Sequence, residues 1–278
     1  MQETRTFKDV IFRAILYLWG LTIVFPLGWI LFESFKTNPE FFENIWALPE
    51  KIQFDNYIRA WNEYNFGQAF SNTMYYVGGS LILGLLFTTL TAYALTRIKF
   101  KGRKAIWSII MISLFLPGIN AIVPQFVVMR DLGLTNSLTG LIILSSLGET
   151  VFYLMILSGF MKGIPKEVEE SAFLDGASHW KVFWKIIVPL SMPGIVTVAI
   201  FKFIDFYNAF LSPLIYLSDP SKYTIGLQMY QANKLMEYSA DWVTLFAGMI
   251  IAMIPSILVF IFFQRWIVKG ATFGSVKG

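Results

Sequence analysis

Six apolar blocks limit this chain more than any other feature of its sequence, because each is long enough to cross a membrane as a helix. A helix needs roughly 20 apolar residues to span a hydrocarbon core about 30 Å thick. Charged residues make up only 14% of the chain, whereas a soluble domain carries about 25%. We therefore predict an all-α integral membrane protein with six transmembrane helices, at residues 11–32, 70–95, 105–129, 138–161, 186–211 and 242–268.

Lysine and arginine are distributed unevenly between the segments that join these blocks. An even number of spans puts both termini on one side, and the segments on that side hold fifteen of these bases against six on the other. Cytoplasmic segments of membrane proteins carry an excess of Lys and Arg, so we expect both termini in the cytoplasm. No tandem repeat or soluble domain is evident, and residues 1–278 are predicted to form one transmembrane domain.

A cytoplasmic loop at residues 162–185 gathers more charge than its apolar surroundings. Pro165 suits the first turn of a helix, where its missing N–H is not needed. The sequence predicts a short helix over residues 165–175, ended by Gly176 at positive φ, and then a second helix capped by Ser178. The alternative interpretation is a connector whose charges only keep it solvated.

Residue types that carry catalysis or bind metals are scarce. The chain has no cysteine and one histidine, which excludes disulfides and thiolate metal sites and argues against a histidine-based metal site. No stretch matches G-x-x-x-x-G-K-S/T, the loop that cradles nucleotide phosphates. We predict no catalytic residue, no metal and no cofactor in this chain, and no nucleic-acid partner.

The charged loop also carries a recognisable spacing: Glu170-Ser171-Ala172, three residues, Gly176, nine residues, Ile186, one residue, Val188-Pro189. It resembles the EAA signature of permease subunits of binding-protein-dependent ABC importers, which reads Glu-Ala-Ala, three residues, Gly, nine residues, Ile, one residue, Leu-Pro. Ser171 and Val188 depart from it conservatively. The stretches TAYALTRIKFKGRK, LGLTNSLTGLIIL, IPKEVEESAFLDGA and QRWIVKGATFGSVKG are similar to the carbohydrate branch, in particular to the shorter membrane subunit of maltose importers.

This resemblance implies a type I importer permease fold in the inner membrane of a bacterium or archaeon, and a sugar or oligosaccharide as the transported solute. It implies that the loop, residues 162–187, docks its short helix on a separate ATPase subunit. The implied partners are a second permease in a heterodimer, two ATPase subunits that hold ATP and Mg²⁺, an extracytoplasmic solute-binding protein and membrane lipid. The residues implied to couple to the ATPase are Glu169, Glu170, Ser171, Ala172, Asp175, Gly176 and Ala177.

Polar side chains within the blocks are costly in lipid and therefore mark candidates for the transport pathway. Sugar hydroxyls need hydrogen-bonding partners, and sugar rings stack on aromatic faces. The expected pathway residues are Asn72, Tyr76, Glu149, Tyr153, Asp205, Tyr207 and Asn208. A structural role is the alternative for these side chains, and Lys202 is spaced to neutralise Asp205 on one helix face.

Two other functions remain open from the sequence. One is an ABC importer permease for a solute that is not a sugar. The other is a secondary transporter, which needs ion-coupling residues within its spans and usually an inverted repeat. Neither feature is clear in this chain.

Overall fold

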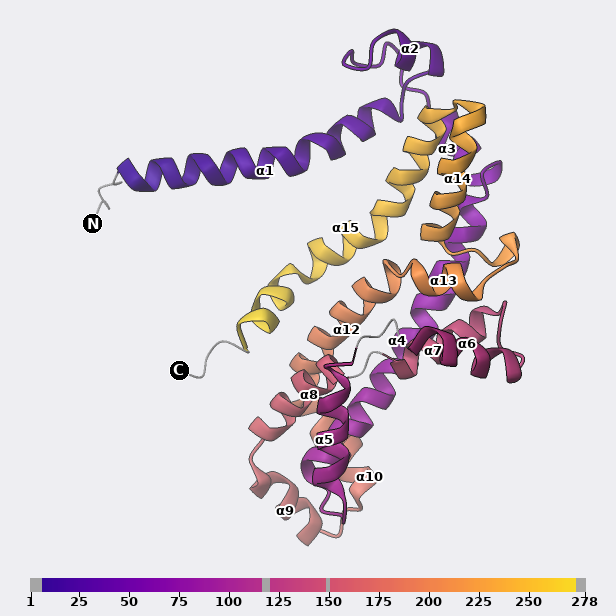
Figure 1. The fold of residues 1–278 in the computed structure, drawn as a ribbon. Helices are drawn as coiled ribbons and strands as arrows, with labels where there is room; N and C mark the ends of the chain where they lie inside the picture. The colour runs from indigo at the N-terminus through magenta and orange to yellow at the C-terminus, as the bar shows by residue number, and fades with distance from the viewer. Residues whose placement is uncertain (1–6, 117–120, 149–150, 274–278) are drawn as a thin grey trace. The chain divides into compact units, whose positions relative to one another are not determined.

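The computed structural model describes residues 7–116, 121–148 and 151–273. Every regular element within these ranges is helical (Figure 1). In chain order the α-helices are α1 (Phe7–Glu33), α2 (Asn38–Glu43), α3 (Asp55–Asn62), α4 (Phe66–Arg97), α5 (Arg103–Ser113), α6 (Ile122–Asp131), α7 (Leu138–Gly148), α8 (Val151–Gly163), α9 (Lys166–Leu174), α10 (His179–Val182), α11 (Val188–Leu190), α12 (Met192–Tyr207), α13 (Leu211–Tyr216), α14 (Ile225–Ser239) and α15 (Trp242–Phe273). A π-helical turn, Phe183–Ile187, joins α10 to α11, and a 3₁₀ turn, Pro220–Lys222, precedes α14.

Three helices in the described ranges are long and apolar enough to cross a membrane: α1, α4 and α15. Two further pairs pass the same test if each counts as one bent span, namely α7 with α8, and His179–Leu190 with Met192–Tyr207. The second pair bends by 75°. The described residues therefore offer three to five candidate spans, where the sequence predicted six.

The third predicted block is the one that differs most. It is not one helix over 105–129, because α5 ends at Ser113 and α6 begins at Ile122. After Ser113 the backbone turns more tightly: the N–H groups of Phe115 and Leu116 donate to carbonyls three residues earlier. Hydropathy sums apolar side chains without registering such a break in the backbone ladder, which explains the wrong prediction of a continuous helix here.

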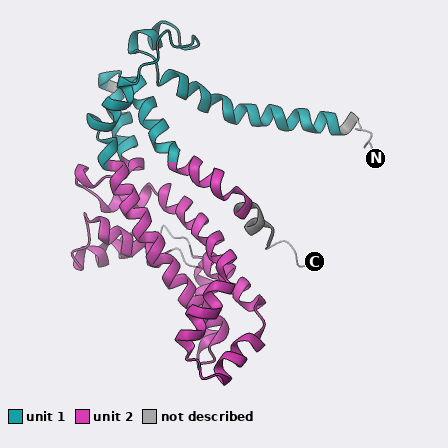
Figure 2. Cartoon of the chain, turned by 180° about the vertical axis from the view of Figure 1, so that it is seen from behind, with its two compact units in different colours: residues 1–68, 228–254 teal, residues 69–227, 255–278 magenta. Residues whose placement is uncertain are grey.

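The chain forms two compact units (Figure 2). Unit 1 consists of Met1–Gln68 and Gln228–Ile254, and unit 2 of Ala69–Leu227 and Pro255–Gly278.

In unit 1 the carboxylate of Asp241 accepts hydrogen bonds from several segments of the chain. Asp241, just before α15, accepts hydrogen bonds from Asn38 Nδ2 at 2.8 Å, Arg59 Nη1 at 3.0 Å and Tyr64 OH at 3.2 Å. Thr244 Oγ1 adds a fourth at 2.9 Å. A negative charge is favourable at the start of a helix, where the backbone dipole is positive. Asp241 thus holds the segments around α2 and α3 to the beginning of α15.

In unit 2 a core of fully buried apolar side chains joins one end of α4 to α8 and to the segment around the π-helical turn. Ala92 and Tyr93 come from α4, Leu157 and Met161 from α8, and Phe183 from the π turn, and all are under 5% exposed. Burial of each large apolar side chain stabilises this end by roughly 1.5–3 kcal/mol. The core supports α9 and α10, which lie together at one end of unit 2 (Figure 1).

Candidate functional site

The short helix predicted in the charged loop is α9, Lys166–Leu174, with Pro165 at its N-cap. Glu167 and Glu169 lie in its first turn, where the helix dipole favours negative charge. At the other end Gly176 has φ +77°. The N–H of Ala177 bonds to the carbonyl of Ala172 and that of Gly176 to Phe173, which is the Schellman arrangement for ending a helix. The predicted helix and its glycine stop are confirmed.

The second predicted helix is also confirmed, and it is shorter and more irregular than a plain α-helix. The Ser178 hydroxyl accepts a hydrogen bond from the N–H of Lys181 at 3.3 Å and so caps α10. After the four residues of α10 the backbone changes to the π-helical turn Phe183–Ile187. Phe183 and Ile187 are buried in the unit 2 core, while Trp180 and Trp184 are exposed by 61% and 47%.

The residues implied to contact an ATPase divide into three groups by exposure. Glu170, Ser171, Asp175 and Gly176 are exposed. Ala172 and Ala177 are half-buried against the unit 2 core. Glu169 is buried, with 9% of its side chain exposed. We call the exposed side of α9 from Val168 to Gly176 the outer face of α9; it also presents Leu174, which is 89% exposed.

Glu169 faces into its own chain and pairs with Arg97, at the end of α4. Glu169 Oε1 lies 2.7 Å from Arg97 Nη1, and both side chains are under 10% exposed. Burial raises the pKa of Glu169 above its usual value, and the positive charge of Arg97 offsets part of that rise. The two effects oppose each other because the pair is removed from water as well as brought together.

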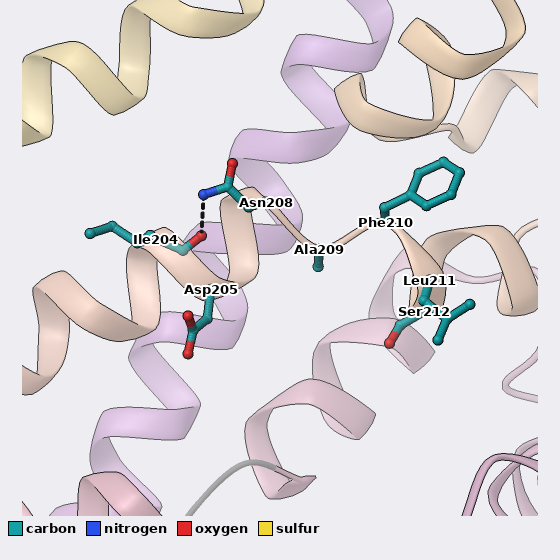
Figure 3. Close-up of a pocket in the computed structure, with 7 residues that line it drawn as sticks. All are labelled: Ile204, Asp205, Asn208, Ala209, Phe210, Leu211 and Ser212. Carbon is teal, nitrogen blue, oxygen red and sulfur yellow. Dashed lines mark hydrogen bonds between the residues drawn. The ribbon is translucent and has the colours of Figure 1, made fainter. Parts of the chain in front are cut away.

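A second candidate region lies where α12 gives way to α13 (Figure 3). A cavity of about 560 Å³ is lined by Ile204, Asp205 and the segment from Asn208 to Ser212. Asp205 projects from the last turn of α12 and Asn208 from the residue that caps this helix, and Asn208 Nδ2 donates to the carbonyl of Ile204 at 2.9 Å. Asp205 also accepts a hydrogen bond from the Tyr153 hydroxyl of α8. The cavity therefore combines a carboxylate, an amide and apolar surface.

The remaining predicted pathway residues occupy other contacts. Asn72 donates to the carbonyls of Ser221 and Tyr223 at 2.8 and 3.0 Å. The Tyr76 hydroxyl lies 2.8 Å from Ser145 Oγ. Tyr207 stacks on Phe203, with ring centroids 5.6 Å apart.

Those three predicted side chains, Asn72, Tyr76 and Tyr207, are buried and do not line the cavity. Glu149 lies outside the described residues. Of the seven predicted positions the structure thus brings together Asp205 and Asn208, with Tyr153 joined to them through Asp205.

Lys202 is fully buried within α12. Its ammonium lies 4.4 Å from the centroid of the Tyr153 ring and 5.5 Å from that of Phe206, in cation–π geometry. Gly84 of α4 makes room for it, since a Cβ at that glycine would lie 3.3 Å from Lys202 Nζ. The ring of Tyr153 therefore faces Lys202 while its hydroxyl bonds to Asp205, so that the lysine and the cavity share one tyrosine.

Sequence reasoning missed Arg97, which it counted only among the loop bases. The available signal was its position: an arginine in the last turn of a long apolar helix, in a chain whose predicted cytoplasmic loop at residues 162–185 carries several acids. That signal indicates a charge partner without saying which acid it is.

These features define an all-helical membrane protein with a structured charged loop. The chain belongs to the family described as "Binding-protein-dependent transport system inner membrane component", which matches residues 62–272. It is 34% identical over 267 residues to the diacetylchitobiose uptake system permease protein NgcG of Streptomyces coelicolor, covering 95% of this chain and 88% of that protein. It is 30% identical over 259 residues to the arabinooligosaccharides transport system permease protein AraQ of Halalkalibacterium halodurans, covering 92% and 91%.

A solved structure shares the fold. One chain of the crystal structure of a bacterial ABC transporter involved in the import of the acidic polysaccharide alginate superposes with a TM-score of 0.82 at 24% identity. The match covers 95% of this chain and 98% of that chain. The fold is therefore that of a type I ABC importer permease, as the sequence resemblance implied.

Proposed function

We propose that this chain is a translocation subunit of an ATP-driven importer for a sugar or oligosaccharide. The names of its relatives support a carbohydrate solute, since one takes up diacetylchitobiose and another arabino-oligosaccharides. The chain crosses the inner membrane of a bacterium or archaeon six times, with both termini in the cytoplasm. It transports without a catalytic site, a metal or a cofactor of its own.

The proposed assembly contains a second permease in a heterodimer, two ATPase subunits that bind ATP and Mg²⁺, and an extracytoplasmic solute-binding protein. The family description, a component of a binding-protein-dependent system, supports the last of these. Closure of the ATPase subunits on ATP favours one of two arrangements of the permeases, because only a ligand with different affinities for two states shifts their balance.

The outer face of α9 carries the proposal for energy coupling. A docking helix needs close approach, charge for pairing and a fixed exit angle, and α9 offers each of them. Ser171 is small, Glu170 and Asp175 are exposed acids, and Gly176 ends the helix at φ +77°. The single supporting observation is that these residues stand exposed on α9 and on the turn that ends it, while Ala172 and Ala177 of the same segment pack against the unit 2 core.

The cavity at the end of α12 is the proposed contact for the solute in this subunit. Asp205 and Asn208 supply a hydrogen-bond acceptor and an amide, and Phe210, 37% exposed, supplies an aromatic face. Neutral sugars need this combination. Substituting Asp205→Asn and Asn208→Ala together should change the range of sugars taken up by the assembled importer, and an unchanged range would return these residues to a structural role.

The coupling proposal is tested by charge reversal on the outer face of α9. In the assembled importer, reconstituted in vesicles, Glu170→Lys should abolish ATP-driven uptake of radiolabelled diacetylchitobiose or arabino-oligosaccharides while the protein remains inserted. Glu167→Lys is the matched control, because Glu167 is an exposed acid of the same helix outside the motif. Normal uptake by Glu170→Lys would reject the coupling role.

A further reconstitution separates the competing functions. Vesicles that contain this chain alone should accumulate no sugar, with or without an ion gradient. Accumulation driven by an ion gradient would establish the secondary transporter instead. If the full importer takes up amino acids or phosphate and none of the sugars, the proposal of a permease stands and that of a carbohydrate solute falls.

A further inference from the structure

Arg97, at the end of α4, contacts two other segments of unit 2. Its Nη2 donates to the carbonyls of Met161 and Ile164, the latter at 2.7 Å. Its Nη1 lies 2.7 Å from Glu169 Oε1. Met161 lies in the last turn of α8, where its carbonyl also accepts the N–H of Ile164 at 3.1 Å, and Ile164 follows directly after Gly163, the last residue of α8. One guanidinium therefore joins the end of α4, the end of α8 and the first turn of α9.

The chemistry of arginine suits a rigid joint of this kind. Its planar guanidinium presents several N–H donors in fixed directions and keeps its charge under all ordinary conditions. The Arg97 side chain is 5% exposed and that of Glu169 is 9% exposed. Because water is excluded, neither group can replace a lost partner with solvent, and breaking the joint carries a large cost.

The two neighbouring acids of α9 consequently differ in what they can do. Glu170 is exposed and available to another subunit, whereas Glu169 points inward and is already paired. A direct contact between Glu169 and an ATPase, as the sequence resemblance implied, would require the buried ion pair to break. The geometry favours a different role for Glu169.

We infer that Arg97 and Glu169 are positioning residues, which hold α9 to the ends of α4 and α8 so that a displacement of α9 moves those helices with it. This inference rests on the proposed function of α9 as the contact for the ATPase. Under this inference Glu170 contacts the ATPase, and Glu169 holds α9 to the rest of its own chain.

Spin-label distances test the positioning directly. The chain has no cysteine, so labels attach only where cysteines are introduced. Ile82→Cys on α4 and Leu174→Cys on α9 are suitable, because these side chains are 70% and 89% exposed. In the full chain in lipid nanodiscs, Arg97→Met should broaden the distribution of distances between the two labels. Arg103→Met is the matched control, since Arg103 donates to one carbonyl, that of Ile98 at 3.3 Å, and should leave the distribution unchanged.

The double variant Arg97→Met with Glu169→Met separates positioning from stability. It removes both charges and leaves no buried charge unpaired, so the amount of assembled importer should recover relative to Arg97→Met alone. Sugar taken up per ATP hydrolysed should stay reduced, by about 2- to 30-fold, the range that single positions in a coupling route produce. A double variant with normal uptake per ATP would overturn the inference and leave the pair a purely stabilising contact.

An unchanged label distribution in Arg97→Met would also overturn it. That result is distinct from failure of the proposed function, because the distance measurement needs no ATPase. Normal uptake by Glu170→Lys counts against coupling through α9, whereas normal distances in Arg97→Met count against the positioning role.

Discussion

Each of the two units contains a charged side chain that has several partners, and these two side chains differ in the kind of partner. Asp241 in unit 1 accepts from four side chains, those of Asn38, Arg59, Tyr64 and Thr244. Arg97 in unit 2 donates to two backbone carbonyls and pairs with one buried carboxylate.

The difference lies in what remains after one partner is lost. Around Asp241 the bonds are to separate side chains, and Arg59 is 35% exposed, so water can replace a missing bond. Around Arg97 water is excluded, and the loss of the guanidinium leaves a buried carboxylate without its counter-charge. We therefore expect the loss of Asp241 to cost less stability than the loss of Arg97.

Replacing Arg97 should destabilise the chain more than any other single change considered for the two units. Arg97→Met should lower the free energy of unfolding by about 3–5 kcal/mol, the usual cost of removing one member of a buried ion pair. Thermal melting of the purified chain measures this loss. In the double variant with Glu169→Met most of the lost stability should return. A loss of the same size in the double variant would mean that the carbonyl bonds, and not the buried charge, dominate.

Asp241→Ala should cost less, about 1.5–3 kcal/mol, because its partners are hydrogen-bonded side chains of which one is partly in water. Asp219→Ala is the control, as Asp219 is 39% exposed and bonds mainly to its neighbour Ser221. The same melting experiment compares them. If Asp241→Ala destabilised as much as Arg97→Met, the contrast between the two centres would fail.

Two glycines, one in each unit, lie against phenylalanine rings and test apolar packing in place of charge. A Cβ at Gly194 would lie 2.5 Å from Phe160 Cγ and 3.0 Å from Phe160 Cβ, at the fixed base of that side chain. A Cβ at Gly248 would lie 2.6 Å from Phe66 Cζ, at the tip of its ring. Overpacking costs roughly 1–3 kcal/mol, and a ring tip moves more easily than a ring base. Gly194→Ala should therefore lower the melting temperature more than Gly248→Ala, and the reverse order would contradict this account.

The smallest effects depend on pH and have opposite signs in the two units. In unit 1 the N–H of Thr37 donates to Glu40 and lowers the pKa of that carboxyl. The contribution of ionised Glu40 to the stability of the folded chain is complete above the unfolded pKa of about 4.3, and it is lost as the pH falls through the lower folded pKa. In unit 2 the raised pKa of Glu169 means that the folded chain holds this proton more tightly than the unfolded chain. Its contribution is complete below the unfolded pKa and decreases as the pH rises towards the folded value.

Melting temperatures between about pH 3.5 and 6, taken for Glu40→Gln and Glu169→Gln against the parent chain, check both signs around the unfolded carboxyl pKa of about 4.3. The stabilising effect of the native Glu40 should grow with pH, and that of the native Glu169 should shrink. If the stabilising effects of Glu40 and Glu169 changed with pH in the same direction, the pKa of one of these two carboxyls would be shifted in the opposite direction to that stated.

Local features of the charged loop followed from its sequence. The limits of α9, the left-handed Gly176 and the Ser178 cap were all predicted, because helix ends are decided by residues within about one turn. The membrane-spanning segments were predicted less well. The predicted span 186–211 extends past Tyr207, where α12 ends. It begins in the π-helical turn, which lies on the other side of the 75° bend from α12. The apolar content of a segment indicates that the segment prefers lipid, but it does not indicate where the helix is interrupted.

The candidate site was predictable in its residue types and not in its pairings. Asp205 and Asn208 were found because polar groups are rare within apolar segments. The pairing of Arg97 with Glu169 was not found, since their positions in the chain are far apart and only the packing of α4 against α8 brings them together. An arginine or glutamate at such a position indicates a charge pair, but the sequence does not indicate which residue is its partner.

The bend between His179–Leu190 and Met192–Tyr207 has a mechanical consequence. At 75° the two arms are close to perpendicular, so a thrust along the axis of the first has only a small component along the second. Such a thrust would turn the second arm sideways, and the far end of that arm, which bears Asp205, would move across its surroundings instead of along its own axis.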